Sequence, residues 1–444
     1  MSRQPISRRQ FLKRAGASAA GATALPLILP SRTWASPPSE RLTLGCIGIG
    51  KMMGGHVETM QARNDVQILA LCDVESKRLG IGRYLVEKAY AERLGKGNYK
   101  AVDTYGDFRE IAARNDIDAA MIATPDHWHT LVSLAMIRSG KDVYCEKPLT
   151  LTIGEGKTLV ETVRRYGRVL QTGSQQRSES AFRVACELVR NGRIGNVHTV
   201  HVNVGGPSAD CLLDPEPVPE GLDWDMWLGP APWRPYNKEL APSLKEGPIE
   251  NWDEFNDQIG PYPNFRGYKD YSGGGMTDWG AHHFDIAQWG LGMDGSGPIE
   301  VSPPNGKDVE FLTYRYENGV VMQRRDAGRA GVVFIGTEGK VMANRGYIET
   351  DPPSLVNSEI KPGEIHLYNS RDHHEDWLNA IRKRTKPICD VEIGHRSASV
   401  CHIGNIASWL NRALRWDPIK EQFIGDEEAN RMIDRPRRSP WRLI

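Results

Sequence analysis

The feature that most constrains this chain is a regular alternation of apolar runs and helical stretches between residues 41 and 172. Alternation of this kind predicts an α/β fold with a parallel, doubly wound sheet. We predict strands at 42–49, 66–72, 119–123, 142–145 and 169–172, and helices at about 54–63, 75–95, 107–115, 129–139 and 154–166.

The pattern changes in the second half of the chain. Loops rich in Gly, Pro and Trp run through 205–275, and alternating strands with Asn-Gly and Glu-Gly turns follow near 310–345. These turns predict a second α/β domain with a large, open, mainly antiparallel sheet. Helices are expected at 373–384 and 397–413, followed by a loop-rich tail. We assign 41–167 to the first domain and 168–444 to the second.

The first 35 residues have the pattern of an export signal. Ser7-Arg8-Arg9-Gln10-Phe11-Leu12-Lys13 precedes an apolar stretch from Ala15 to Pro30, and Thr33-Trp34-Ala35 offers a cleavage site. This predicts a twin-arginine signal at 1–35, a linker at 36–40, and delivery to the periplasm by the twin-arginine translocation machinery. A basic tail on a cytosolic chain and an uncleaved anchor are the alternatives.

Charge and hydropathy exclude two classes of protein. Residues 1–35 carry six basic and no acidic residues, so the remainder has 50 basic and 56 acidic residues, a net charge of −6. An acidic chain is poorly suited to the phosphate backbone of nucleic acid. Outside the N-terminus no run of 18 apolar residues exists, so we expect no stable membrane insertion.

The seven cysteines are an odd number and form no CxxC pair. Several of them lie in apolar, strand-like runs. We therefore interpret them as small buried side chains rather than as a disulfide framework or a zinc site.

A glycine turn follows the first strand. Gly48 and Gly50 permit a tight turn that brings the backbone close to a pyrophosphate at a helix N-terminus, and Lys51 and Met52 come next as candidate contacts. Met53 stands where a third glycine is usual, which puts close helix–strand packing in doubt. Alone, the motif is weak, and a glycine loop without a cofactor is the alternative.

Asp73 ends the second strand, 23 residues after Gly50. A carboxylate at this position accepts hydrogen bonds from ribose hydroxyls and repels a 2′-phosphate, which favours NAD over NADP. The alternative is that Asp73 caps the following helix.

Two further motifs end strands at the same expected sheet edge. Thr124-Pro125-Asp126-His127-Trp128-His129 follows one strand, and Glu146-Lys147-Pro148 follows the next. Cofactors bind at this edge in doubly wound folds. We take Thr124, Pro125, His129, Glu146 and Lys147 as candidate cofactor contacts. A metal on His127 and His129 is disfavoured because no Cys or carboxylate lies at suitable spacing.

The sequence MTDWGAHHFDIAQW supplies candidate proton-transfer groups. Asp278 and His282 are four residues apart, which places them on one face of a helix. A lysine, a histidine and an orienting carboxylate suit alcohol oxidation, with Lys147 placed near the nicotinamide. The alternatives are a surface lysine and a helix-stabilising Asp–His pair.

These pieces, taken in order, resemble the Gfo/Idh/MocA oxidoreductase family. The matching segments are GIG at 48–50, CD at 72–73, ATPDHWH at 123–129, EKP at 146–148 and GGGMTDWGAHHFD at 273–285. The resemblance implies a Rossmann domain, bound NAD and a sugar, glycoside or polyol substrate; we also expect a homo-oligomer. The ending of the chain resembles that of exported members.

The resemblance also implies roles for individual residues. Lys147 matches the lysine that hydrogen-bonds the reacting hydroxyl, His282 the acid/base histidine, and Asp278 the aspartate four residues before it. Gln175 lies where the family often places a residue near the nicotinamide. His283 departs from the commonest pattern.

Aromatic and basic residues of the second half suggest a carbohydrate substrate. Ten of twelve tryptophans lie at or after residue 224, and aromatic rings stack on sugar faces, although a core role is equally compatible. Arg234, Arg266, Tyr268 and His283 are candidate substrate contacts. Two other functions stay open: an NAD-dependent glycosidase or lyase acting through a keto-sugar, and a noncatalytic sugar sensor. The family's glycosidases lack the EKP lysine, which favours redox chemistry here.

Overall fold

The computed structural model describes residues 40–95 and 97–443. The predicted export signal, and the linker up to residue 39, lie outside these residues. Within them, no helix has both the length and the apolar character needed to cross a bilayer.

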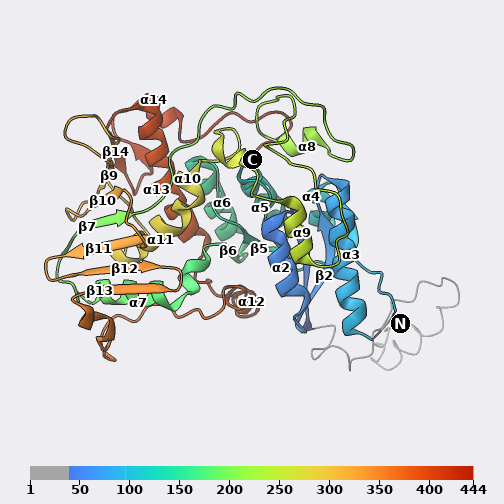
Figure 1. Ribbon diagram of the computed structural model, residues 1–444, viewed down its shortest axis with the longest axis horizontal. Helices are drawn as coiled ribbons and strands as arrows, with labels where there is room; N and C mark the ends of the chain where they lie inside the picture. The colour runs from blue at the N-terminus through green and yellow to red at the C-terminus, as the bar shows by residue number, and fades with distance from the viewer. Residues whose placement is uncertain (1–39, 96, 444) are drawn as a thin grey trace, which may run out of the picture.

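The N-terminal domain is built on a parallel six-stranded sheet, as the sequence predicts (Figure 1). β3 was not predicted, because its three residues include an exposed Asp and lack an apolar run. β6 pairs with β5, so this sheet extends past residue 167. The strand order is β3 (Asp103–Tyr105), β2 (Val66–Cys72), β1 (Leu42–Ile47), β4 (Ala119–Ile122), β5 (Asp142–Cys145) and β6 (Leu170–Thr172).

Helices cover both faces of this sheet, and each face has its own apolar core. Cys46 and Cys145 are completely buried within these cores, as expected of small apolar side chains. On one face lie α2 (Lys51–Gln61) and α3 (Ser76–Arg93). On the other lie α4 (Phe108–Ala113), α5 (Asp126–Arg138) and α6 (Ile153–Tyr166).

The C-terminal domain contains a nine-stranded sheet. It is mainly antiparallel, but β7 and β10 pair in parallel, which makes the sheet mixed. The order is β13 (Tyr347–Asp351), β12 (Lys340–Asn344), β11 (Val332–Gly336), β7 (Val197–Val202), β10 (Val321–Arg324), β9 (Leu312–Arg315), β8 (Glu300–Ser302), β14 (Leu414–Asp417) and β15 (Gln422–Phe423).

One face of this sheet packs on α7 (Ser180–Arg190), α11 (Gly280–Leu291) and α13 (Val391–Leu410) (Figure 1). The other face is partly exposed, as the alternation of buried and partly exposed residues in β7 and β12 shows. α12 (His373–Lys383) instead joins the core of the N-terminal domain. α14 (Glu427–Arg431) follows the last strand.

Residues between β7 and α11 extend over the N-terminal domain. This segment carries α8 (Trp224–Leu228) and α9 (Trp252–Ile259), and α9 lies beside α2 (Figure 1). The two helices approach closely at Gly54, where a Cβ would lie 3.3 Å from the ring of Trp252. We call residues 222–266 the cover segment. The chain end also returns to the N-terminal domain, where the Trp441 ring packs 4.7 Å from that of Trp128.

Candidate active site

The glycine turn after β1 adopts the geometry that an anion site requires. Gly48 has φ of +86°, and a Cβ there would lie 2.7 Å from the Thr124 amide nitrogen, so only glycine fits. Gly50 precedes α2 and provides no side-chain cap, and the space beside it is open for 4 Å. The first amide groups of α2 therefore lie beside a space suited to a phosphate group.

Met53 does not weaken the packing of α2. Its side chain is completely buried in the core that α2 shares with the sheet. The close approach usually served by a glycine occurs one residue later, at Gly54, against α9. Met53 thus packs against the sheet while Gly54 admits the cover segment, a contact that no local pattern predicts.

A cleft of about 1130 Å³, including its open mouth, runs along the carboxyl edge of the six-stranded sheet. Its volume and its mixture of apolar walls with a few polar groups are typical of a cofactor site. Seven of the predicted cofactor contacts line it: Gly48, Gly50, Lys51, Met52, Asp73, Thr124 and Pro125. The predicted substrate residue Arg266 lines it as well.

Asp73 lies in this cleft and is not the helix cap. Its carboxylate accepts hydrogen bonds from the amides of Ile49 (2.6 Å) and Glu75 (2.9 Å). Glu75 is the cap of α3, accepting from the next two amides. Burial raises the pKa of Asp73, against the opposing effect of Arg78. A carboxylate has about four acceptor sites, so two bonded amides leave room for ribose hydroxyls.

The cover segment forms the wall of the cleft that faces the start of α2. Lys51 Nζ donates to the carbonyl of Gly260 at 2.7 Å and lies over the Tyr262 ring. The Tyr262 hydroxyl lies 3.2 Å from Met52 Sδ. Sequence reasoning missed these wall residues, because the segment has no periodic pattern and its contacts join residues about 200 positions apart. From the cover segment the cleft is lined by Leu222, Met226, Trp227, Leu240–Ser243, Ile259, Tyr262, Pro263 and Phe265.

His129 does not line the cleft, contrary to prediction. Its Nδ1 lies 2.7 Å from the carbonyl oxygen of Pro148, and its Nε2 lies 2.8 Å from that of Thr124. The ring therefore joins the two loops that end β4 and β5. His127 is buried too, with Nε2 3.0 Å from the Trp227 carbonyl. Both histidines therefore hold loops in place.

Glu146 and Gln175 lie outside the cleft walls and contact each other. Gln175 begins the short helix η2 (Gln175–Ser178), and its amide donates to Glu146 Oε1 at 2.8 Å. His56 Nε2 lies 2.9 Å from the same oxygen, and His56 Nδ1 lies 2.8 Å from His374 Nε2. Burial alone would raise the pKa of Glu146, but His56, Lys147 and Gln175 outweigh it and lower the pKa to about 2.

Lys147 and Asp278 form the central ion pair of the site. Lys147 Nζ donates to Asp278 Oδ1 at 2.7 Å and to the Asp278 carbonyl at 3.0 Å. Arg266 Nε lies 3.5 Å from the same carboxylate oxygen. Burial opposes ionisation of Asp278, but the two cations outweigh it and lower its pKa. Because Arg266 also lines the cleft, this group adjoins the cofactor site.

His282 is not oriented by Asp278, which corrects the sequence interpretation. The helix is interrupted at Trp279: α10 (Gly275–Asp278) ends there and α11 begins at Gly280. The Asp278 carboxylate is bound to Lys147 instead. Burial, followed by the charges of Lys147 and Arg345, holds the pKa of His282 well below its usual value. A neutral imidazole is a weaker partner for a carboxylate than an ammonium group.

The imidazole of His282 keeps an unused nitrogen. Its side chain is 4% exposed, and its Nδ1 has no hydrogen-bond partner among the described residues. Buried polar atoms without partners are rare and often mark functional positions. His282 therefore has a ring nitrogen that no group of the described residues occupies.

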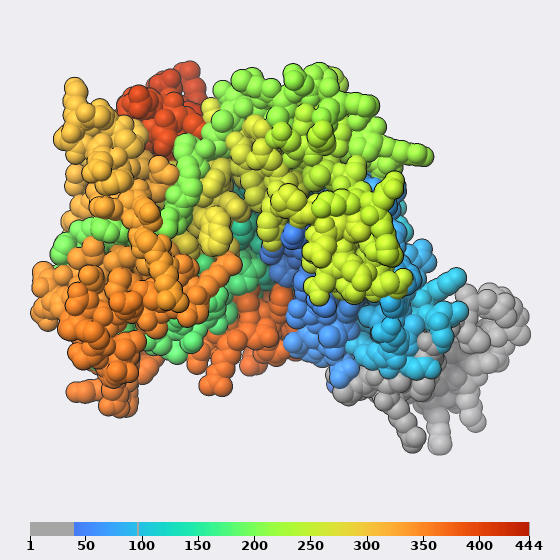
Figure 2. Space-filling model, viewed as in Figure 1, coloured from blue at the N-terminus to red at the C-terminus, as the bar shows by residue number. Residues whose placement is uncertain are grey.

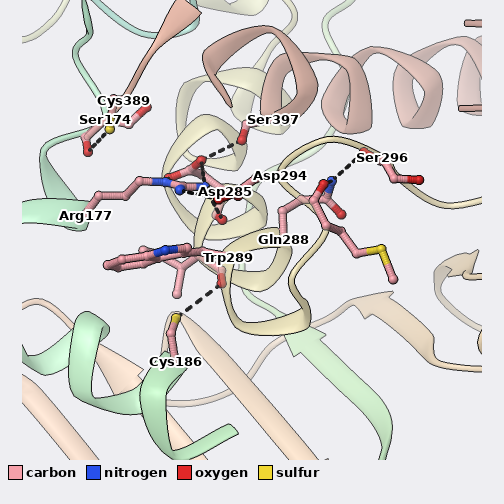
Figure 3. Close-up of polar contacts among 12 residues, drawn as sticks. Ser174, Arg177, Cys186, Asp285, Gln288, Trp289, Asp294, Ser296, Cys389 and Ser397 are labelled. Carbon is pink, nitrogen blue, oxygen red and sulfur yellow. Dashed lines mark hydrogen bonds and ion pairs between the residues drawn. The ribbon is translucent and has the colours of Figure 1, made fainter. Parts of the chain in front are cut away.

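A buried ion cluster anchors α11 immediately after His282 (Figure 3). Arg177 is 1% exposed and donates two hydrogen bonds of 2.8 Å to Asp285. It also donates to Asp294 at 2.7 Å, and Ser397 on α13 donates to Asp285 at 2.6 Å. This cluster, which sequence reasoning missed, ties η2, α11 and α13 together and so fixes the position of His282.

Arg234 and His283, two of the other predicted substrate residues, contact backbone carbonyl groups of the protein itself. Arg234 donates to the carbonyls of Cys211 (3.2 Å) and Leu213 (2.6 Å), because that irregular loop lacks backbone partners of its own. His283 is buried and lies 2.8 Å from the carbonyl of Asn203. Tyr268 is half-buried beside Asn264 and does not line the cleft.

The tryptophans divide between core and surface. Trp224 and Trp227 stack on each other at 4.7 Å, and Trp252 is buried in the core of the N-terminal domain. Trp233 and Trp279 are 66% and 43% exposed. Trp279 is the residue directly after Asp278 and therefore lies next to the Lys147–Asp278 ion pair.

Family comparison agrees with this architecture. Residues 42–174 match the NAD-binding Rossmann domain of an oxidoreductase family, and residues 207–443 match that family's C-terminal α/β domain. The chain belongs to the Gfo/Idh/MocA oxidoreductase family. This confirms the resemblance drawn from the five sequence motifs.

Several curated proteins and solved structures resemble this chain at low sequence identity. The chain is 28% identical to a myo-inositol 2-dehydrogenase of Thermotoga maritima, over 87% of this chain and 99% of that one. It is 31% identical to a glycosyl hydrolase family 109 protein of Shewanella, over 56% of each. Among solved structures, scyllo-inositol dehydrogenase of Lactobacillus casei, with bound NAD(H) and scyllo-inositol, shares the fold: TM-score 0.52, 16% identity, 84% of this chain and 99% of that one.

Proposed function

We propose that this protein is an NAD(H)-dependent oxidoreductase that oxidises a hydroxyl group of a sugar, glycoside or polyol. The observation that carries the proposal is the Lys147–Asp278 ion pair, 2.7 Å long, which Arg266 links to the cofactor cleft and whose lysine charge acts on the buried imidazole of His282. The 28% identity to an inositol dehydrogenase over nearly its whole length supports the same class of substrate.

The cleft fits NAD. The open N-terminus of α2 beside Gly50 suits the pyrophosphate, and the Asp73 carboxylate suits the adenosine ribose while opposing a 2′-phosphate. When bound, NAD supplies the acceptor for a hydride. The contacts of Lys51 and Tyr262 across the cleft favour retention of the cofactor through repeated cycles.

Lys147 and His282 have different roles in the proposed removal of the hydroxyl proton. Lys147, held by Asp278, is placed to donate a hydrogen bond to the reacting hydroxyl and to stabilise negative charge on its oxygen. His282 is neutral at pH 7, because its pKa is held well below its usual value, and so can accept the hydroxyl proton. The buried Arg177 cluster keeps that ring in position.

A single-turnover experiment tests the proposal. Mixing NAD-loaded enzyme with candidate sugars and polyols should produce the absorbance of reduced nicotinamide, and denaturing the purified protein should release NAD(H). His282→Ala should slow the step by at least about 10²-fold, the scale of general-base catalysis, and retain the cofactor. His198→Ala, at an exposed strand position, is the matched control.

The same experiment separates the glycosidase alternative suggested by the family 109 relatives. A redox-neutral cleavage would release the aglycone and show at most transient reduction of the nicotinamide. Absence of NAD(H) from the purified protein, or cleavage without any transient reduction, would reject the redox assignment.

We also propose that the protein is exported, on the basis of Arg8-Arg9 and the apolar stretch that follows. The twin-arginine pathway carries folded proteins, which suits a protein that must take up its cofactor in the cytoplasm. Assembly as a homo-oligomer is proposed on the sequence expectation alone.

A further inference from the structure

Arg345 lies in the turn that joins β12 to β13, close to the proposed substrate side of the site. Its guanidinium lies 5.1 Å from the centre of the Trp279 ring. Trp279 directly follows Asp278, and its ring centre is 6.0 Å from that of His282. Arg345 therefore lies within one sugar ring's reach of the proposed catalytic groups, although it is far from them in sequence.

The sheet edge explains this proximity. β7 ends beside the end of β10, and β11 begins beside the end of β12, so these strand ends and the β12–β13 turn lie at one edge. The same edge contacts α11, since the Asn203 carbonyl after β7 lies 2.8 Å from His283 Nδ1. The space-filling view shows a hollow between the orange strands of the sheet domain and the yellow-green cover segment, with blue and teal residues at its floor (Figure 2).

Arg345 is held in a defined orientation. With the side-chain amide of Gln176 in the orientation that satisfies both its neighbours, its oxygen accepts from Arg345 Nε at 3.2 Å and its nitrogen donates to the His282 carbonyl at 3.2 Å. Gln176 is completely buried. The stacking on Trp279 and the bond at Nε together leave the two terminal nitrogens of the guanidinium without a protein acceptor among the described residues.

No acidic residue neutralises this arginine. Within residues 40–95 and 97–443, no carboxylate oxygen lies within 4.0 Å of Arg345, nor of Arg324, Arg325 or Arg329 at the same edge. The nearby Asp326 uses its carboxylate on the amide of Gly328. On the other side of the site, Asp278 is shared by Lys147 and Arg266, and Glu146, next to Lys147, is bonded to His56 and Gln175. Among Lys147, Arg266 and Arg345, only Arg345 therefore has no carboxylate partner among the described residues.

We infer that the substrate is an anionic carbohydrate, whose carboxylate or phosphate group binds the two free nitrogens of Arg345 while its ring contacts Trp279. A planar guanidinium fixed through Nε presents its remaining donors as a fork, which matches two oxygens of an oxyanion. The exposed tryptophan supplies an apolar surface for a sugar face. This inference rests on the proposed oxidoreductase function and specifies its substrate class.

Matched pairs of probes test the inference with the NAD-loaded, full-length enzyme. We would compare glucuronate with glucose, galacturonate with galactose, and each neutral sugar with its 6-phosphate, by calorimetry and by single-turnover absorbance. At least one anionic probe should bind about 10- to 100-fold more tightly than its neutral partner, the range for a charge-assisted pair. Preference for the uronate or for the phosphate identifies which oxyanion the site takes.

Substitutions assign the effect to Arg345. Arg345→Gln should remove the preference, whereas Arg345→Lys, which keeps the charge but not the fork, should retain part of it. Arg165→Gln, on an exposed helix position remote from the site, is the control and should change nothing. Equal binding of every anionic and neutral partner, or an unchanged preference in Arg345→Gln, would overturn the inference.

The two proposals fail separately. If neutral sugars reduce the bound nicotinamide and anionic ones neither bind more tightly nor react faster, the enzyme is an oxidoreductase and the anionic substrate is wrong. If anionic sugars bind through Arg345 and no reduced nicotinamide forms, the substrate class holds and the redox function is wrong.

Discussion

Replacing Asp278 with Asn tests which neighbour its carboxylate serves. The ion pair with Lys147 is 2.7 Å long, and the two side chains are only 26% and 13% exposed. Exposed pairs contribute at most about 1 kcal/mol, and removing one partner of a buried pair costs about 3–5 kcal/mol. This partly buried pair lies between these limits, so we expect a loss of about 2 kcal/mol, or about 30-fold in rate.

The fold should tolerate the substitution. Lys147 Nζ keeps its hydrogen bond to the Asp278 carbonyl at 3.0 Å, and Asn preserves the size of the side chain. Retention of NAD should therefore change little, and the fall in the free energy of unfolding should stay below about 2 kcal/mol, the value of the whole pair. The loss should be in the hydride-transfer rate, because the ammonium group is no longer held toward the reacting oxygen.

Double-mutant cycles on the single-turnover rate identify the partner. If Asp278 acts through Lys147, Asp278→Asn should cost about 30-fold in the His282→Ala background but less than about 3-fold in the Lys147→Met background. The opposite pattern, in which the effect disappears with His282 and persists without Lys147, would show that the carboxylate orients the imidazole. It would refute our assignment from the structure.

Three other outcomes are expected. Asp73→Ala should weaken NAD binding by about 1–3 kcal/mol, and tighter binding of NADP than NAD by the wild type would contradict the role of Asp73. Folding lowers the pKa of Glu146 from 4.5 to about 2, so the ionised carboxylate contributes about 3 kcal/mol to the free energy of unfolding above pH 4.5. This contribution is lost as the pH falls toward 2, about 1.4 kcal/mol of it by pH 3.5, so the difference in unfolding free energy between wild type and Glu146→Gln should shrink by that amount. A difference that stays constant with pH would refute this role of Glu146. Changing Arg8 and Arg9 to Lys should leave precursor in the cytoplasm, whereas normal delivery through an intact twin-arginine pathway would refute the export proposal.

The N-terminal domain was predictable because its signals are local. Each strand is a short apolar run, and the residues directly after β1, β2 and β4 meet at one sheet edge in any parallel arrangement. Gly48, Asp73 and Thr124 therefore line one cleft, as the sequence predicted. What could not be predicted is the cover segment, since its contacts with α2 have no periodic pattern and join residues about 200 positions apart.

Single side chains were harder to assign than motifs. Arg234 has the composition of a sugar-binding residue but binds loop carbonyls, and His129 ends a promising motif but joins two loops. In both cases the competing partner is a backbone carbonyl, which no side-chain pattern reveals. Arg345 is the converse case: nothing in its local sequence marks it, and only the sheet topology brings it to Trp279.

The Asp278 assignment illustrates how a correct motif can suggest a wrong partner. Spacing of four residues places two side chains on one helical face, but the preference of a carboxylate depends on which cation lies closest. Lys147 enters from the end of β5 and is charged, whereas His282 is kept neutral by burial and by that same lysine. The charge of Lys147 thus both binds Asp278 and lowers the pKa of His282, the other candidate partner of that carboxylate. In the proposed reaction, the held ammonium group of Lys147 would bind the reacting hydroxyl and the imidazole of His282 would accept its proton, which are the two roles that alcohol oxidation requires.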